Sequence, residues 1–154
     1  MRIGIVVDSA CDLPKSFIEE NNIVVMPISV RVGDKTFVDR RDPQETWSFY
    51  ASHLDTRSED HAESIPWTQQ QIEELFLDRM VLEYDHVFCL TITSARSLIY
   101  DHANKASLNI IGRYKERRRQ AGVQGPCSDA AINSRTMSTA QAGRPPDGTP
   151  LIAA

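Results

Sequence analysis

Residues 3–7, Ile-Gly-Ile-Val-Val, form a nearly continuous aliphatic run that is followed at once by Asp8 and Ser9, and then by Pro14. Such a run is typical of a parallel strand buried on both faces, and proline suits the first turn of a helix. Open α/β sheets bind ligands at the carboxyl ends of their strands, where the chain turns toward the next helix. This junction therefore predicts an α/β fold with its function at strand ends, although it also fits an ordinary strand-to-helix connection.

The next segments predict a β-hairpin and two helices. Residues 23–32 are β-rich, with a bend or an edge position at Pro27 because proline cannot donate to a ladder, and Gly33-Asp34 suits a hairpin turn. Asp42 and Thr68 cap two helices, and the polar residues 55–66 between these helices predict a loop. The first of the two helices carries apolar residues at helical spacing: Trp47, Tyr50, Ala51 and Leu54.

A second aliphatic strand, residues 86–92, again ends in residues that bear hydroxyl groups. A long helix over residues 98–120 follows, and its basic end complements the helix dipole. A weak strand at 129–132 comes next, before a stretch rich in glycine and proline at 143–154 that we expect to be a disordered tail. These elements predict a three-layer α/β domain with a short, mainly parallel sheet over residues 1–142.

Composition narrows the classes of function. The 154 residues suit one domain, and 17 Lys and Arg against 21 Asp and Glu give a net charge of −4, which argues against nucleic-acid partners. No stretch approaches the roughly 20 apolar residues of a membrane span, and the start lacks a leader segment, so we expect a cytoplasmic protein. The three scattered cysteines predict reduced thiols, and the four histidines have no ligand spacing, so we expect neither a metal nor another cofactor.

Three turns rich in hydroxyl groups stand at the predicted strand and helix boundaries. Hydroxyls, backbone N–H groups at a helix start and a nearby guanidinium can all donate to a carboxylate or a phosphate. If the turns converge, they form a cradle for an anion, whereas each turn alone also fits the usual turn and capping roles of serine and threonine. The candidate ligand-binding residues are Asp8, Ser9, Ser64, Thr93, Ser94, Arg96 and Ser97.

Asp8 also invites comparison with the aspartyl nucleophile of phosphoryl-handling hydrolases. Such enzymes need a second acid two residues later as a general acid, but Ala10 occupies that position and the next acid is Asp12. We therefore expect the chain not to be an enzyme, with the hydrolase as an alternative.

The same turns resemble motifs of the DegV family of fatty-acid-binding proteins, over about residues 1–142. Residues 6–14, Val-Val-Asp-Ser-Ala-Cys-Asp-Leu-Pro, are similar to the family's opening DS-x-x-DLP, and residues 23–39 resemble its next strand pair. Residues 133–142 resemble its D-S-x-x-x-S-x-G-Q-G stretch, with Asn133 in place of the aspartate and alanines in place of both glycines.

The resemblance implies a carrier that grips the carboxylate of a fatty acid with hydroxyls and holds the acyl chain in an apolar groove. The family's TS-x-P-S loop carries a carboxylate-binding threonine. Counting back from Pro66 puts Glu63 at that place, whereas a one-residue deletion puts Ser64 there. Binding requires Ser64, because Glu63 would repel a carboxylate.

The family's SS-x-x-SGT loop resembles the turn after the second aliphatic strand. Thr93, Ser94 and Ser97 preserve its hydroxyl positions, which implies Ser94 as a donor to the head group. Leu98-Ile99 replaces the Gly-Thr of the motif.

The resemblance to DegV proteins implies a two-domain molecule with a tunnel between the domains. It also implies a protein that presents its substrate to a fatty-acid kinase. The resemblance stops near Gly143, so we expect an N-terminal half only, either truncated or frame-shifted, without the C-terminal lipid-binding domain. It implies impaired binding of a long-chain fatty acid, or binding by a homo-oligomer. A fragment or interaction module without a ligand is the remaining alternative.

Overall fold

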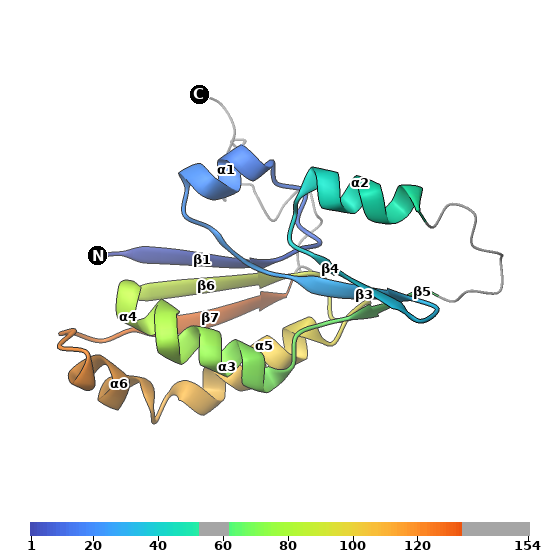
Figure 1. Ribbon diagram of the computed structural model, residues 1–154. Coiled ribbons are helices and arrows are strands. Elements are labelled where there is room, and N and C mark those ends of the chain that lie inside the picture. The colour runs from blue at the N-terminus through green and yellow to red at the C-terminus, as the bar shows by residue number, and fades with distance from the viewer. Residues whose placement is uncertain (53–61, 134–154) are drawn as a thin grey trace, which may run out of the picture.

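The computed structural model describes residues 1–52 and 62–133, and a parallel sheet lies at its centre. Four strands have the order β2-β1-β6-β7, and every neighbouring pair is parallel. Their carboxyl ends therefore lie at one end of the sheet, as Figure 1 shows. The strands are β1 (Ile3–Asp8), β2 (Val24–Met26), β6 (His86–Thr91) and β7 (Ser128–Asn133).

Helices lie on both faces of this sheet, which confirms the predicted three-layer α/β architecture (Figure 1). One face carries α1 (Lys15–Glu20). The helix that begins at the predicted cap Thr68 lies on the other face, and Thr68 forms a capping box with Gln71. The elements on that face are α3 (Gln69–Leu75), the π-helical turn η1 (Phe76–Met80), α4 (Val81–Glu83), α5 (Ile99–Ile110) and α6 (Tyr114–Gln120).

The parallel sheet separates two apolar clusters, because successive side chains of a strand point to opposite faces. Val6 and Cys89 belong to the larger cluster, which includes residues of α3, η1 and α5, and burial raises the pKa of the Cys89 thiol. Val7 belongs to the smaller cluster, together with Ile18 of α1 and with Ile23. The first aliphatic run is therefore packed on both of its faces, as the sequence predicts.

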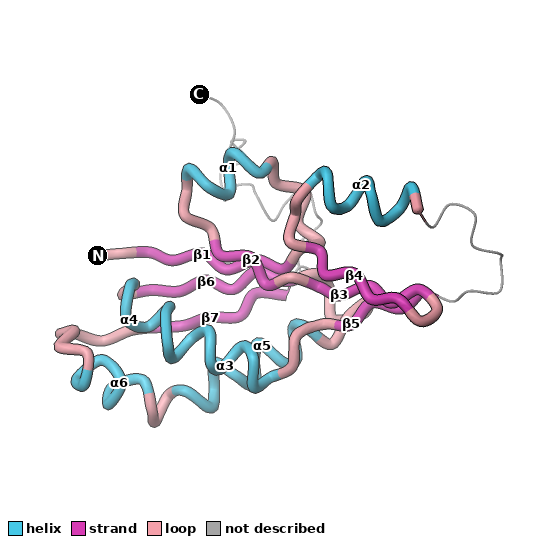
Figure 2. Tube along the Cα trace, viewed as in Figure 1, coloured by secondary structure: helices cyan, strands magenta, loops and turns pink. Residues whose placement is uncertain are grey.

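A second, antiparallel sheet follows the carboxyl end of β2. Its strands are β3 (Ile28–Val32), β4 (Lys35–Asp39) and β5 (Ala62–Ile65), in the order β4-β3-β5. Pro27 separates β2 from β3, which confirms the predicted bend, and Gly33 has a φ of 56° in the predicted hairpin turn. Figure 2 shows the two groups of strands end to end, with turns between them.

Residues 62–65 correct the sequence prediction, which placed them in a loop. They form β5, whose register against β3 pairs Ile65 with Ser29 and Glu63 with Arg31. The sequence Ala-Glu-Ser-Ile gives little local indication of a strand, because exposed β5 is held by its pairing with β3 rather than by burial. The other residues of the predicted loop up to residue 61, and the predicted tail at 143–154, lie outside the described residues.

Helix α2 (Pro43–Ala51) begins where the sequence predicts, but its apolar stripe faces outward. The Asp42 carboxylate accepts the backbone N–H groups of Gln44 and Glu45 at 2.9 and 3.1 Å, which fixes the helix start. Contact with the second sheet comes instead from Phe49, whose ring stacks on that of Phe37 with centroids 4.7 Å apart. Within the described residues, the side chains of Trp47 and Tyr50 are therefore largely exposed.

The predicted helix over residues 98–120 is wrong as a single element, because it breaks between α5 and α6 around Gly112. Glycine is a poor helix former, and the break lets α6 turn toward the carboxyl end of α4. There the Arg118 guanidinium donates to the carbonyls of Val81 at 2.6 Å and Tyr84 at 2.9 Å, and pairs with Asp85 at 3.2 Å. Arg118 is only 2% exposed, so this part of the basic run ties α6 to α4 instead of facing solvent.

We predict that Arg118→Ala destabilises the protein by about 3 kcal/mol or more, because it leaves buried carbonyls and part of Asp85 without a donor. Arg117→Ala is the matched control: Arg117 pairs with Asp78 on the surface, and such pairs contribute less than about 1 kcal/mol. Urea unfolding followed by circular dichroism measures both. Equal, small losses in the two variants would contradict the anchoring role of Arg118.

Candidate functional site

Asp8 closes the carboxyl end of β1 and ties it to the end of β6. Its carboxylate accepts the N–H of Ala10 at 2.9 Å and the N–H of Ile92 at 2.6 Å. The residue is only 2% exposed, and burial raises the pKa of Asp8 although these two bonds favour its charged form. Asp8 therefore lies at the predicted strand end, where it holds two neighbouring turns in place.

Ser9 ties the same turn to the second sheet. Its hydroxyl accepts the N–H of Ile28, the first residue of β3, at 2.9 Å, and its own N–H donates to the carbonyl of Met26 at 3.0 Å. Like Asp8, Ser9 is buried. The two residues of the first predicted turn are thus brought together as a frame, with their polar atoms directed at backbone.

The second predicted turn follows β6 and is folded tightly on itself. The carbonyl of Thr93 accepts the N–H groups of Arg96 and Ser97 at 2.9 and 3.3 Å, and the Thr93 hydroxyl accepts the N–H of Ala95 at 3.3 Å. The Ser97 hydroxyl accepts the N–H of Ile99, at the start of α5, at 3.3 Å. Ser94 of this turn is half-buried, and Arg96 is exposed.

The third predicted turn is a strand whose alternation separates the two candidates that the sequence left open. Ser64 pairs with Val30 of β3, and Val30 pairs with Phe37 of β4, so these three side chains share one face of the second sheet. Glu63 points to the opposite face, where it forms an ion pair with Arg31. The Ser64 hydroxyl and the Glu63 carboxylate therefore lie on opposite faces of β5.

The turns after β1 and β6 lie at the carboxyl end of the parallel sheet and are connected through Asp8, whereas Ser64 lies in the second sheet, paired with Val30. Besides the bonds of Asp8 and Ser9, the ring of His102 in α5 donates through Nδ1 to the carbonyl of Trp67, just after β5, at 2.7 Å. Sequence reasoning missed His102 and the backbone N–H of Ile92, because neither residue carries a local motif.

Thr91, the last residue of β6, is a further polar residue that the sequence analysis missed. It is 5% exposed, and within the described residues its hydroxyl has no hydrogen-bond partner. The aliphatic run of β6 gives no indication of it, because a threonine at the end of a strand is common.

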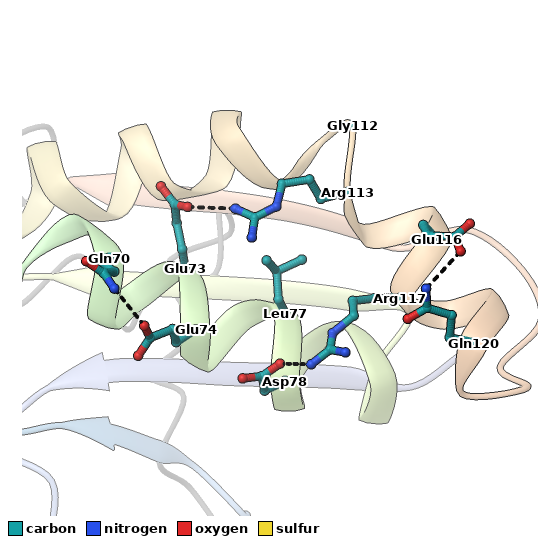
Figure 3. A pocket seen from close by; sticks show the side chains of 10 residues that line it. All are labelled: Gln70, Glu73, Glu74, Leu77, Asp78, Gly112, Arg113, Glu116, Arg117 and Gln120. Carbon is teal, nitrogen blue, oxygen red and sulfur yellow. Dashed lines mark hydrogen bonds and ion pairs between the residues drawn. The ribbon is translucent and has the colours of Figure 1, made fainter.

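Charged side chains that pair with one another line a groove elsewhere on the molecule. The groove has a volume of about 760 Å³ and lies between α3, η1 and α6. Figure 3 shows Glu73 paired with Arg113, at 3.0 Å, and Asp78 paired with Arg117 across it. Hydrogen bonds from the side-chain amides of Gln69 and Asn109, together with the charge of Arg113, lower the pKa of Glu73. None of the predicted site residues lines this groove.

Two other kinds of functional feature are absent from the described ranges. In residues 1–52 and 62–133, no helix is both long enough and apolar enough to cross a bilayer. The same residues contain no group of three or more His, Cys, Asp or Glu side chains that could hold a metal ion.

Comparison with known proteins places the chain beside a family of about twice its length. Residues 2–124 match the family model described as "Uncharacterised protein, DegV family". A DegV domain-containing protein of Xanthomonas campestris pv. campestris is 48% identical over 141 residues, which are 92% of this chain and 45% of that protein. A fatty acid-binding protein of Thermotoga maritima is 33% identical over 115 residues, 71% of this chain and 38% of its own length.

Solved structures share the fold at lower identity. A stearic acid-binding protein from Eubacterium ventriosum superposes with a TM-score of 0.68 at 23% identity, over 86% of this chain and 41% of its own. The fatty acid kinase B3 protein of Streptococcus pneumoniae, loaded with linoleic acid, gives a TM-score of 0.59 at 22% identity, over 87% of this chain and 42% of its own. The chain thus spans less than half the length of the proteins it matches.

We predict that Asp8→Asn lowers the free energy of unfolding by about 1–3 kcal/mol, because the amide presents an N–H where the carboxylate accepts one. Asp12→Asn, at an exposed carboxylate of the same segment, is the control and should change little. Urea unfolding compares the two. Unchanged stability in Asp8→Asn would show that the β1–β6 link contributes little.

Proposed function

The chain belongs to the DegV family, and on that premise we propose that it supplies one half of a binding site for a long-chain fatty acid. The observation that supports the proposal is the position of Asp8 and Ser9 at the carboxyl end of the parallel sheet, where they bond to Ile92 before the second hydroxyl turn and to Ile28 of β3, the strand that pairs with β5. Ligand sites of open α/β sheets lie at this end. The fatty acid-binding relative from Thermotoga maritima supports the class of ligand.

In this proposal Ser94 and Ser64 donate to the carboxylate of the fatty acid. Hydroxyl donors suit a carboxylate, and the exposed guanidinium of Arg96 supplies the opposite charge at the same turn. Thr93 and Ser97 complete this turn. Asp8 and Ser9 act through the backbone that they hold, because both are buried and their side chains accept N–H groups.

The acyl chain provides most of the affinity and the hydroxyls provide orientation. About fifteen methylenes at ~0.8 kcal/mol each amount to roughly 12 kcal/mol of burial, whereas a hydrogen bond to a charged group contributes only about 1.5–3 kcal/mol. An apolar groove with one wall covers only part of that chain. We therefore propose that these 154 residues orient a fatty acid better than they retain it.

We further propose that the chain performs no chemistry and presents its ligand to a separate fatty-acid kinase in the cytoplasm, a compartment that suits three unpaired cysteines. The kinase B3 relative supports that partner. A hydrolase using Asp8 is disfavoured, because this carboxylate is enclosed and both of its oxygens accept N–H groups. Phosphate release that depends on Mg²⁺ and on Asp8 would favour the hydrolase.

We expect Ser94→Ala and Ser64→Ala each to weaken fatty-acid binding by about tenfold, because each removes one donor to a charged group. The matched control is Ser128→Ala, since Ser128 begins β7 at the opposite end of the sheet. Calorimetric titration with palmitate, with circular dichroism to check folding, measures the change. Equal affinities in all three variants would remove the hydroxyl turns from the proposal.

We expect the 154-residue polypeptide to bind palmitate in the millimolar range as a monomer, or more tightly only as an oligomer, because half the acyl burial is offset by the entropy of association. Native mass spectrometry of the protein purified from bacteria reports both the bound lipid and the number of subunits. Submicromolar binding by a monomer would contradict the one-wall interpretation. A protein that carries no lipid and binds none would favour a fragment without a ligand.

A further inference from the structure

A second groove lies between the start of α1 and the exposed side of α2. Its volume is about 570 Å³, and Figure 1 shows the two helices on the same side of the molecule. Leu13 and Pro14 line one side, and Trp47 and Tyr50 of α2 line the other. This volume falls within the usual range for sites that take small ligands, about 300–1,000 Å³.

The aromatic side of this groove is unusually open for residues of this type. Trp47 is 73% exposed and Tyr50 is 51% exposed. Large aromatic side chains at helical spacing are ordinarily covered, and an exposed group of them marks a site of interaction. Helix α2 contacts the second sheet through Phe49, which stacks on Phe37.

One end of the groove is cationic. Arg41 lines it, and its guanidinium reaches only the carbonyl of Leu13, at 3.5 Å, with no ion pair to any carboxylate of the described ranges. Lys15 also lines the groove and is held near Asp42 at 3.4 Å. The backbone of Arg41 has a φ of 60°, a conformation that residues other than glycine rarely adopt.

We propose that this groove binds an amphiphilic anion, a molecule with a carboxylate or similar head at Arg41 and an apolar tail along Trp47 and Tyr50. The proposal concerns a second site, separate from the hydroxyl turns. Charge complementarity selects the ligand class: a neutral lipid would leave Arg41 without a partner, and an anion without a tail would leave the aromatic side chains uncovered. The groove between α3 and α6 offers no such match, since its arginines, Arg113 and Arg117, already pair with Glu73 and Asp78.

The two tryptophans of the chain allow the two sites to be tested separately. Trp47 lines this groove, and Trp67 lies three residues after Ser64 of the proposed hydroxyl site. Trp67→Phe leaves Trp47 as the only tryptophan, and Trp47→Phe leaves Trp67. The probe is 9,10-dibromostearate below its micelle concentration, because bromine quenches indole fluorescence on contact, and unbrominated stearate is the control ligand.

We expect dibromostearate, but not stearate, to quench Trp47 in the Trp67→Phe background. Adding Arg41→Ala should weaken this quenching about tenfold, while Arg40→Ala, an exposed neighbour that does not line the groove, should leave it unchanged. Adding Ser94→Ala should also leave it unchanged. Circular dichroism checks that each variant is folded.

Three results would overturn the second site. Quenching of Trp67 without quenching of Trp47 would do so and leave the hydroxyl site intact. Quenching of Trp47 that Ser94→Ala abolishes and Arg41→Ala does not would assign the ligand to the hydroxyl turns. Absence of quenching of Trp47 at any concentration below the micelle threshold would leave the aromatic stripe as a surface for a protein partner.

Discussion

The hydrogen bonds of the Asp8 carboxylate fix the end of the molecule where the candidate site lies. A buried carboxylate is stable only where donors surround it, and here the donors are the N–H groups of Ala10 and Ile92. Ser9 extends the same arrangement to Ile28, and so positions the second sheet against the first. The turn with Thr93, Ser94, Arg96 and Ser97 begins directly after Ile92, the residue whose N–H Asp8 accepts.

In the proposed site, the head group and the acyl chain of the ligand bind to different parts of the molecule. The hydroxyl turns are small, polar and held by many local bonds, so they suit the orientation of a head group and contribute little burial. In the proposed site the acyl chain lies over the second sheet, whose strand β5 is exposed along its whole length. We expect the proposed site to select the head group but to bind the whole ligand weakly, because affinity follows the apolar area that is covered.

Local features of the sequence predict those parts of the fold that are decided locally. The aliphatic runs of β1 and β6 and the caps at Asp42 and Thr68 are visible in the sequence, and the structure has them. Strand β5 and the break near Gly112 depend on distant partners, namely pairing with β3 and the reach of Arg118 to α4. The candidate site divides in the same way: its hydroxyls are visible in the sequence, but the backbone donor of Ile92 is not.

The alternation of β5 then restricts where an acyl chain can lie. A head group on Ser64 must occupy the face that Ser64 shares with Val30 and Phe37, because Glu63 and its ion pair with Arg31 occupy the other face. Phe49 of α2 stacks on Phe37 at the far side of that face. In the proposed site, a tail that starts at Ser64 therefore runs over Val30 toward these two rings, and α2 forms the end of that path.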